Sequence, residues 1–357
     1  MAEIQQPKIR VLIHYGSHGN NRDDARHIKK AVSGFKPHFY SPEWLWSESP
    51  EEVERLNGLI PIARADLKQR EKFLHDTSSW GDKTSAYIRK ELEAIVDTPG
   101  AKVCNLQATT PERLEQYMRE FQAGPERVVE KGISFYLGDF ENALRQMHEH
   151  AVLSIKNHEM REEDIIKNMR GFRRELSKHP ELHGEKEIRI YVRIGGEHTP
   201  LTEALRKLPG IEVDEANDSP PEFERHDTIA QLMNRKRQQE LNDPEYRRVL
   251  ARAFLGSMLN TFLLERTGFA AAGESAGAVM AGNFSENEIR QISEECGKRN
   301  LGYNQFNVKK RIFEEIMKPK LKEKGISIPT SEAEVEQMLR KIRPRTSFSE
   351  PWRARKE

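Results

Sequence analysis

Residues 8–15 read KIRVLIHY, a run of β-branched and aliphatic side chains that ends at the segment GSHGNN, residues 16–21. An apolar run of this length, bounded by glycine and asparagine, is typical of a strand buried on both faces. Residues 22–35, RDDARHIKKAVSGF, follow with apolar side chains at helical spacing. The same order of strand, loop and helix occurs again from residues 187–194, EIRIYVRI. This second strand also ends at a segment that contains glycine. The chain therefore contains two buried strands that each lead through a loop into a helix.

Shorter segments extend this strand–loop–helix order. Residues 36–44 (KPHFYSPEW) and 101–108 (AKVCNLQA) predict two short strands, and residues 211–216 (IEVDEA) predict another after the helix of residues 199–210. Right-handed crossovers between such strands produce a mostly parallel central sheet with helices on both faces. We therefore expect an α/β fold with a helical C-terminal extension, because the chain beyond the last strand shows almost only helical patterns.

The expected domain organisation follows from these elements. Residues 1–218 are expected to form the α/β core, with a charged helical insertion at about 50–95. Residues 219–345 are expected to form a helical C-terminal region, and residues 346–357 a basic tail. The composition is polar for this length, with 36% hydrophobic and 32% charged residues. It predicts many exposed helices around one modest core.

The charge balance and the cysteines limit the classes of partner and compartment. The chain has 58 basic and 57 acidic residues, so it offers no electrostatic argument for nucleic acid or a membrane as a partner. Cys104 and Cys296 lack metal-ligand spacing and are expected to be free thiols in a reducing compartment. The apolar stretch 249–269 is interrupted by Arg252 and Asn260, which favours a buried helix over a membrane span. With no signal-peptide pattern at the N-terminus, we expect a cytoplasmic protein.

Residues 273–277, GESAG, match the G-x-S-x-G elbow that carries the nucleophile of serine hydrolases. In α/β-hydrolases the triad histidine follows the serine in the chain, whereas the last histidine here is His226. The elbow also needs a preceding strand, and residues 261–273 predict a helix that ends in small residues. We therefore interpret Ser275 as part of a flexible or closely packed glycine–alanine connection. The chain also lacks H-E-x-x-H, G-x-G-x-x-G and Walker A motifs.

Three ionisable residues follow predicted strands at the positions where parallel sheets bind ligands. His18 lies between Gly16 and Gly19, Glu43 follows the second strand, and His198 follows the strand of residues 187–194. Imidazole and carboxylate groups can bind Zn²⁺, Mn²⁺ or Fe²⁺, or can act as a base and its orienting partner for a water molecule. His18, Glu43 and His198 are therefore the candidate site.

Four segments together resemble the erythromycin esterase/ChaN/TraB superfamily, which includes the Tiki-type metalloproteases. VLIHYGSHGN resembles the family's first strand motif, and FKPHFYSPE its second strand with a terminal glutamate. HEMREEDIIKNM resembles a helical arginine–acidic segment, and IYVRIGGEHTPLTEAL a second Gly-x-x-His strand exit. The resemblance spans roughly residues 8–216 and implies the same α/β core.

The resemblance also implies roles for individual residues. His18 and His198 are similar to the two Gly-x-x-His histidines, which in Tiki-like members bind a divalent metal such as Mn²⁺ or Zn²⁺. Glu43 is similar to the family glutamate, as a metal ligand or general base. Arg161 is similar to the arginine that orients an anionic group or the Glu43 carboxylate. Tyr15 stands where the family has glycine, and Gly16 stands where esterase-like members carry glutamate, which leaves the acid partner of His18 open. The choice between Glu162 and Glu163 beside Arg161 also stays open.

Two functions from different classes remain. The first is a hydrolase of an ester, amide or peptide bond, in which His18, Glu43, His198 and Arg161 act on a small-molecule or peptide substrate, with a divalent metal if one binds. The second is a non-catalytic protein that binds a small or haem-like ligand through the same histidines and the aromatic cluster Phe39, Tyr40, Trp44 and Trp46. A third hypothesis treats the fold as inactive and the C-terminal helices as an interaction surface. The sequence sets no oligomeric state.

Overall fold

The structure of the chain is a computed structural model. It divides into two compact units: residues 1–114, 158–219 and 346–357 form the first, and residues 115–157 and 220–345 form the second. The structure describes residues 7–16, 22–46, 48–78, 85–195, 198, 200–217, 241–267, 270–299, 310–331, 333–335 and 337–338.

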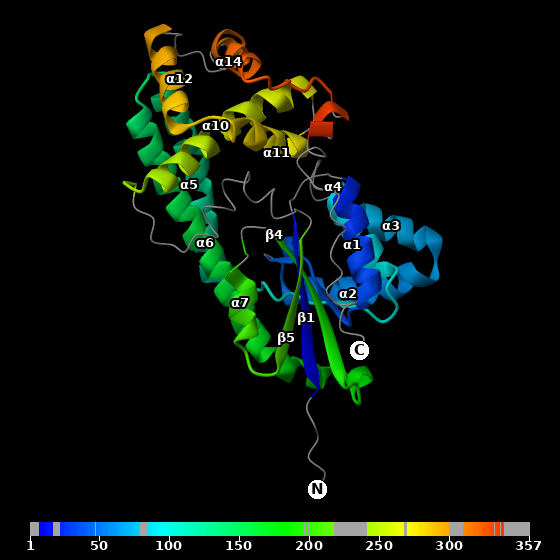
Figure 1. Ribbon diagram of the computed structural model, residues 1–357. Coiled ribbons are helices and arrows are strands. Elements are labelled where there is room, and N and C mark those ends of the chain that lie inside the picture. The colour runs from blue at the N-terminus through cyan, green and yellow to red at the C-terminus, as the bar shows by residue number, and fades with distance from the viewer. Residues whose placement is uncertain are drawn as a thin grey trace, which may run out of the picture. The chain divides into compact units, whose positions relative to one another are not determined.

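A five-stranded sheet with the order β3-β2-β4-β1-β5 forms the centre of the first unit, and every strand pair is parallel (Figure 1). β1 and β4 pair along their whole length, from Lys8 opposite Glu187 to Gly16 opposite Gly195. Their carboxyl ends therefore lie side by side. The strands are β1 (Lys8–Gly16), β2 (Phe39–Ser41), β3 (Lys102–Val103), β4 (Glu187–Gly195) and β5 (Ile211–Asn217).

Helices cover both faces of this sheet, as the sequence predicts. On one face, Leu12, Tyr40 and Tyr191 share a buried cluster with α1 (Arg22–Phe35), α2 (Pro50–Ala65), α3 (Leu67–Ser78) and α4 (Ser85–Val96). On the other face, Ile13 and Val192 share a cluster with the second half of α6 (Phe140–Glu175) and with α7 (Pro200–Arg206). Two 3₁₀ turns, Leu176–Lys178 and Pro180–Leu182, connect α6 to β4. The predicted α/β fold is confirmed.

The predicted insertion at about 50–95 consists of α2, α3 and α4, and Arg64 fixes it to the sheet. The Arg64 guanidinium donates to the carbonyls of Ile95, Val96, Thr98 and Ala101, at distances from 2.7 to 3.1 Å. These carbonyls span the end of α4 and the approach to β3. One half-buried guanidinium thus satisfies backbone groups that neither the helix nor the strand pairs by itself.

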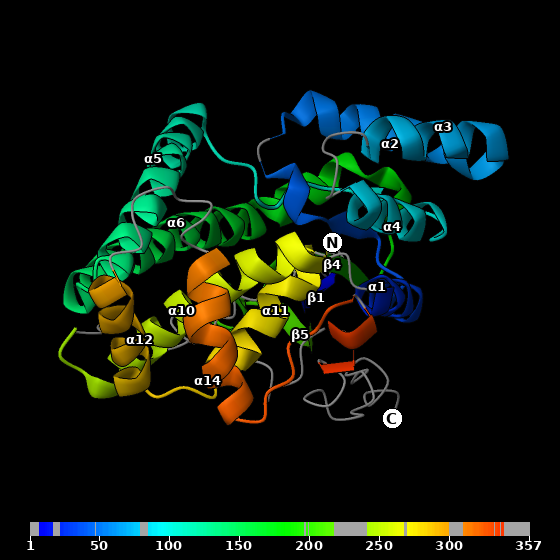
Figure 2. The same cartoon turned by 90° about the horizontal axis from the view of Figure 1, so that it is seen from above.

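The second unit is helical (Figure 2). It has its own apolar core. Residues 115–157, which the sequence assigns to the α/β core, belong to this unit. The physical reason is the apolar face of the first half of α6, where Phe140, Leu144 and Met147 lie in the core formed by the C-terminal helices. The elements are α5 (Pro111–Tyr136), part of α6, α10 (Pro244–Thr267), α11 (Ala270–Ala281), α12 (Glu286–Arg299), a π-helical turn (Phe313–Met317) and α14 (Lys318–Glu323).

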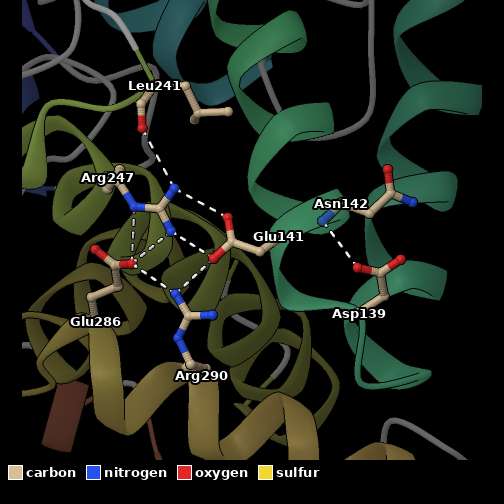
Figure 3. Close-up of polar contacts among 7 residues, drawn as sticks. All are labelled: Asp139, Glu141, Asn142, Leu241, Arg247, Glu286 and Arg290. Atoms are coloured by element: carbon tan, nitrogen blue, oxygen red, sulfur yellow. Dashed lines mark hydrogen bonds and ion pairs between the residues drawn. The ribbon is translucent and has the colours of Figure 1, made fainter.

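A charged cluster connects three helices of this unit (Figure 3). Arg247 on α10 contacts Glu141 on α6 at 2.8 Å and Glu286 on α12 at 2.9 Å. Arg290 contacts Glu141 at 2.7 Å, and its guanidinium carbon lies 4.6 Å from the centre of the Phe140 ring. The ion pairs therefore hold together helices that are far apart in the sequence.

The GESAG motif lies inside α11 rather than on a strand-to-helix turn. Gly277 packs against α10: a Cβ atom there would lie 2.6 Å from the Gly256 carbonyl oxygen and would overlap the Asn260 side chain. The glycine therefore permits close approach of two helices. Of the two alternatives, a flexible or a closely packed connection, the structure shows close packing at Gly277, and the motif is part of a helix and not a connection. No helix among the described residues is long and apolar enough to cross a membrane.

Candidate functional site

A 3₁₀ turn, Glu43–Leu45, follows β2 and presents Glu43 at the carboxyl edge of the sheet. One carboxylate oxygen of Glu43 accepts the Gly195 N–H at 2.7 Å, and the other lies 2.9 Å from an Arg161 nitrogen. The side chains of Glu43 and Arg161 are each 12% exposed. Glu43 thus joins the end of β4 to α6 through both of its oxygens.

Arg161 connects this carboxylate to two further segments. It donates to Oε1 of Gln107, which follows β3, and its guanidinium carbon lies 5.5 Å from the centre of the Trp46 ring. A guanidinium that pairs with a carboxylate and stacks on an indole is held in one orientation. The expectation that Arg161 orients Glu43 agrees with this geometry.

The loop after β3 fixes the turn that carries Glu43. The Asn105 amide donates to the Leu45 carbonyl, and the Leu106 N–H donates to Ser41 Oγ at 3.1 Å. The same loop is fixed to α6, because the Asn168 amide donates to the carbonyls of Leu106 and Ala108. These side-chain bonds replace the longer strand that the sequence predicts for residues 101–108.

His198 forms a second pair, with Glu162. The His198 side chain is fully buried and its Nδ1 lies 3.2 Å from Oε1 of Glu162, which is 6% exposed. The ring of His158, one helical turn before Glu162 on α6, lies 4.6 Å from the His198 ring. A buried carboxylate beside an imidazole favours one tautomer of the ring and stabilises its protonated form.

Tyr15 holds the backbone of His198 in place. Its hydroxyl donates to the His198 carbonyl at 3.3 Å and lies 2.7 Å from Thr202 Oγ1 on α7. Burial raises the pKa of the Tyr15 phenol above its ordinary value, which the Thr202 hydrogen bond only partly offsets. Tyr15 therefore stays neutral and serves as a hydrogen-bond donor. Tyr15 thus has a clear structural function.

The structure places the predicted site residues in two pairs. Glu43 meets Arg161, and His198 meets Glu162, so consecutive residues of α6 serve the two pairs. His18 lies outside the described residues. His14 in β1 is fully buried and bonds to Tyr191.

Of the predicted metal set, His18 lies outside the described residues, and Glu43 and His198 lie within the part of the chain that the structure describes. There, no group of three histidine, cysteine or acidic residues is arranged to hold a metal ion. Both described members of the predicted set have other partners, since Glu43 is bound to Arg161 and Gly195 and His198 faces Glu162.

The sequence did not single out Gln107, Thr202 or Tyr15 as site residues, and it left Glu162 undecided. His158 and Glu162 carried a usable signal, because residues four apart on a helix lie on one face. For Gln107 and Thr202 no local signal exists, since their partners are distant in the chain.

No protein-family model matches the chain, and neither does any curated protein or solved structure.

Proposed function

We propose that this protein is a hydrolase of an ester or amide bond, in which His198 is the general base and Glu162 orients it. The observation that carries the proposal is the buried His198–Glu162 contact at the carboxyl edge of the parallel sheet. Ligand sites of open α/β sheets lie at this edge. The resemblance of residues 8–216 to the erythromycin esterase/ChaN/TraB superfamily supports the same class of reaction, and we propose membership on those motifs.

The proposed reaction uses the imidazole twice. His198 takes a proton from a water molecule while the water oxygen bonds to the carbonyl carbon of the substrate. The imidazolium then returns the proton to the leaving oxygen or nitrogen as the bond to carbon breaks. Glu162 stabilises the imidazolium without taking the proton itself, as the carboxylate of a catalytic triad does.

Glu43 and Arg161 have a positioning function in this proposal. Glu43 binds the N–H of Gly195, three residues before His198, and so fixes the segment that carries the base. A carboxylate that pairs with a guanidinium at 2.9 Å is a weak proton acceptor, which argues against Glu43 as the base.

A divalent metal does not fit the described donors as they stand. Mn²⁺ or Zn²⁺ at Glu43 would have to displace Arg161 or the Gly195 N–H. We therefore propose a reaction that does not depend on a metal ion. Elemental analysis of the purified protein after incubation with each ion tests this directly, and stoichiometric binding that is lost in His198→Ala would contradict it.

The aromatic cluster gives the ligand-binding alternative no support. Phe39 packs edge-on against Phe172, Tyr40 packs against Tyr191, Trp44 bonds to Glu91 and Trp46 contacts Arg161. All four rings serve internal contacts.

The test is a screen of nitrophenyl esters and peptide amides with matched variants. His198→Gln and Glu162→Gln are expected to lower kcat by about 10²–10⁴-fold, the usual contribution of general-base catalysis. The control is Glu163→Gln, the next residue of α6, whose side chain is 68% exposed and contacts Arg113. It is expected to retain wild-type kcat. Turnover by His198→Gln at the wild-type rate would refute the proposal.

We further propose a cytoplasmic location. The two cysteines are free, which agrees with a reducing compartment. Burial raises the pKa of each thiol to about 12, so both stay protonated at neutral pH.

A further inference from the structure

A second buried polar network lies on the sheet face that α4 covers. Glu91 on α4 is fully buried and accepts the indole N–H of Trp44 at 2.7 Å. Nε of Arg193, a β4 residue that is 1% exposed, lies 3.8 Å from the other carboxylate oxygen. Burying two ions costs solvation that their attraction only partly returns, and apolar residues of similar volume are often as stable. Stability alone therefore does not account for this pair.

Arg193 also reaches the end of β1. Its Nη1 donates to the His14 carbonyl at 3.4 Å, and a Cβ atom on Gly16 would overlap its guanidinium. Gly16 is the last residue of β1, and its φ angle is not positive, so its backbone conformation does not require glycine. The glycine is therefore needed for space, because only a residue without a side chain leaves room for Arg193.

The network shares its backbone with the candidate site. Trp44 is the neighbour of Glu43 in the same 3₁₀ turn, and Arg193 lies two residues before Gly195, whose N–H binds Glu43. On one side of the sheet Arg161 holds this turn, and on the other side Glu91 holds it through Trp44. The ends of β1, β2 and β4 are thus fixed from both faces.

We propose that Glu91 is a positioning residue of the site: through Trp44 and Arg193 it fixes the turn that carries Glu43 and the ends of β1 and β4. The inference rests on the proposed function for its catalytic consequence, but its structural consequence can be measured without a substrate. In Glu91→Gln the side chain keeps its shape, but Trp44 bonds to a neutral and weaker acceptor and Arg193 loses the negative charge of Glu91. The turn then loosens, and Glu43 releases the Gly195 N–H more often.

The experiment is amide hydrogen exchange of the full chain, wild type against Glu91→Gln. Exchange at Gly195 and at residues 43–46 is expected to rise about tenfold or more, while the strand amides of Ile190 and Val192 keep their wild-type rates. The control is Glu93→Gln on the same helix, whose carboxylate contacts Arg89 and Lys90 at 24% exposure. It should leave all these rates unchanged. A uniform rise across the sheet, or no rise at Gly195, overturns the inference.

Trp44→Phe is the second variant, and it removes the indole N–H while retaining an aromatic ring. It is expected to raise the same local exchange rates, and it keeps the inference testable if Glu91→Gln does not fold. With an active substrate from the screen, both variants should lower kcat about tenfold or more at little changed KM, as a displaced catalytic group does. If the wild type has no turnover and the exchange pattern is still local, the proposed function fails and the positioning inference holds.

Discussion

Glu162 and Glu163 are neighbours in sequence, but they have opposite environments. Glu162 is 6% exposed and contacts His198, whereas the Glu163 side chain is 68% exposed and contacts Arg113. Consecutive helical residues point about 100° apart, so only one of them can face the sheet. The sequence supplies the pair of carboxylates but not the rotation of α6, which the packing of Ile165 and Met169 sets.

Gly16 and Gly58 provide a matched test of the space argument. Gly16→Ala is expected to lower the free energy of unfolding by about 1–3 kcal/mol, because the new methyl group displaces the buried Arg193 guanidinium. At Gly58 in α2 a new Cβ atom would meet nothing within 4 Å. Gly58→Ala is therefore expected to raise the free energy of unfolding by about 0.4–1 kcal/mol. Urea unfolding monitored by circular dichroism measures both, and equal effects of the same sign would contradict the argument.

His38 makes the stability of the sheet unit dependent on pH. Its Nδ1 accepts the Arg189 N–H at 3.0 Å, which requires a neutral ring, and burial together with the nearby Arg189 charge lowers its pKa. A histidine with a lowered folded pKa stabilises above its unfolded pKa of about 6.5, and this contribution is lost as pH falls through the folded pKa. Wild type is therefore expected to lose stability relative to His38→Gln as pH falls below about 6.5, because the glutamine amide oxygen can accept the same bond at every pH.

Parallel stability-against-pH curves for wild type and His38→Gln would show that this hydrogen bond does not depend on protonation. The comparison between the two proteins cancels the contribution of the other histidines.

At the scale of elements, α10 and α11 cross in close contact. Gly256 and Gly277 face each other, and a Cβ atom on Gly256 would lie 3.3 Å from the Cα of Ala278. Gly277, the last glycine of the G-x-S-x-G match, is explained by this crossing, because a residue without a side chain lets two helix backbones approach. A motif of five residues is too short to distinguish a catalytic turn from a helix contact without the position of its neighbours.

Gly277→Ala is expected to destabilise the helical unit by about 1–3 kcal/mol, since the methyl group would meet backbone and Asn260 atoms that cannot move far. The control is Gly171→Ala in α6, where a Cβ atom meets nothing within 4 Å. Thermal unfolding followed at 222 nm compares the two variants. An unchanged melting temperature for Gly277→Ala would mean that the helices separate at little cost.

At the scale of the whole molecule, the polar composition predicts one modest core, but the described residues form three apolar clusters. Two of them lie on the faces of the sheet, and the third lies among the helices of the second unit. The reason is geometric: a parallel sheet buries both faces, and the C-terminal helices bury their own apolar sides together.

Because each unit has its own core, we expect calorimetry to resolve two unfolding transitions. Gly16→Ala is expected to lower the transition of the sheet unit, and Gly277→Ala that of the helical unit. A single transition that both variants shift equally would contradict this expectation. It would show that the two units unfold together, coupled through α6, which contributes residues to both.

The sequence by itself determined the strands, most of the helices and the parallel α/β architecture, because these follow from local hydrophobic period and from the handedness of crossovers. It also placed Glu43, Arg161 and His198 at strand exits or on the helix near them. Only the tertiary structure decided which of these groups meet. Arg161 pairs with Glu43 from 118 positions away and His198 pairs with Glu162, 36 positions apart. Such pairs depend on the rotation and register of packed elements, and the local pattern of residues carries neither.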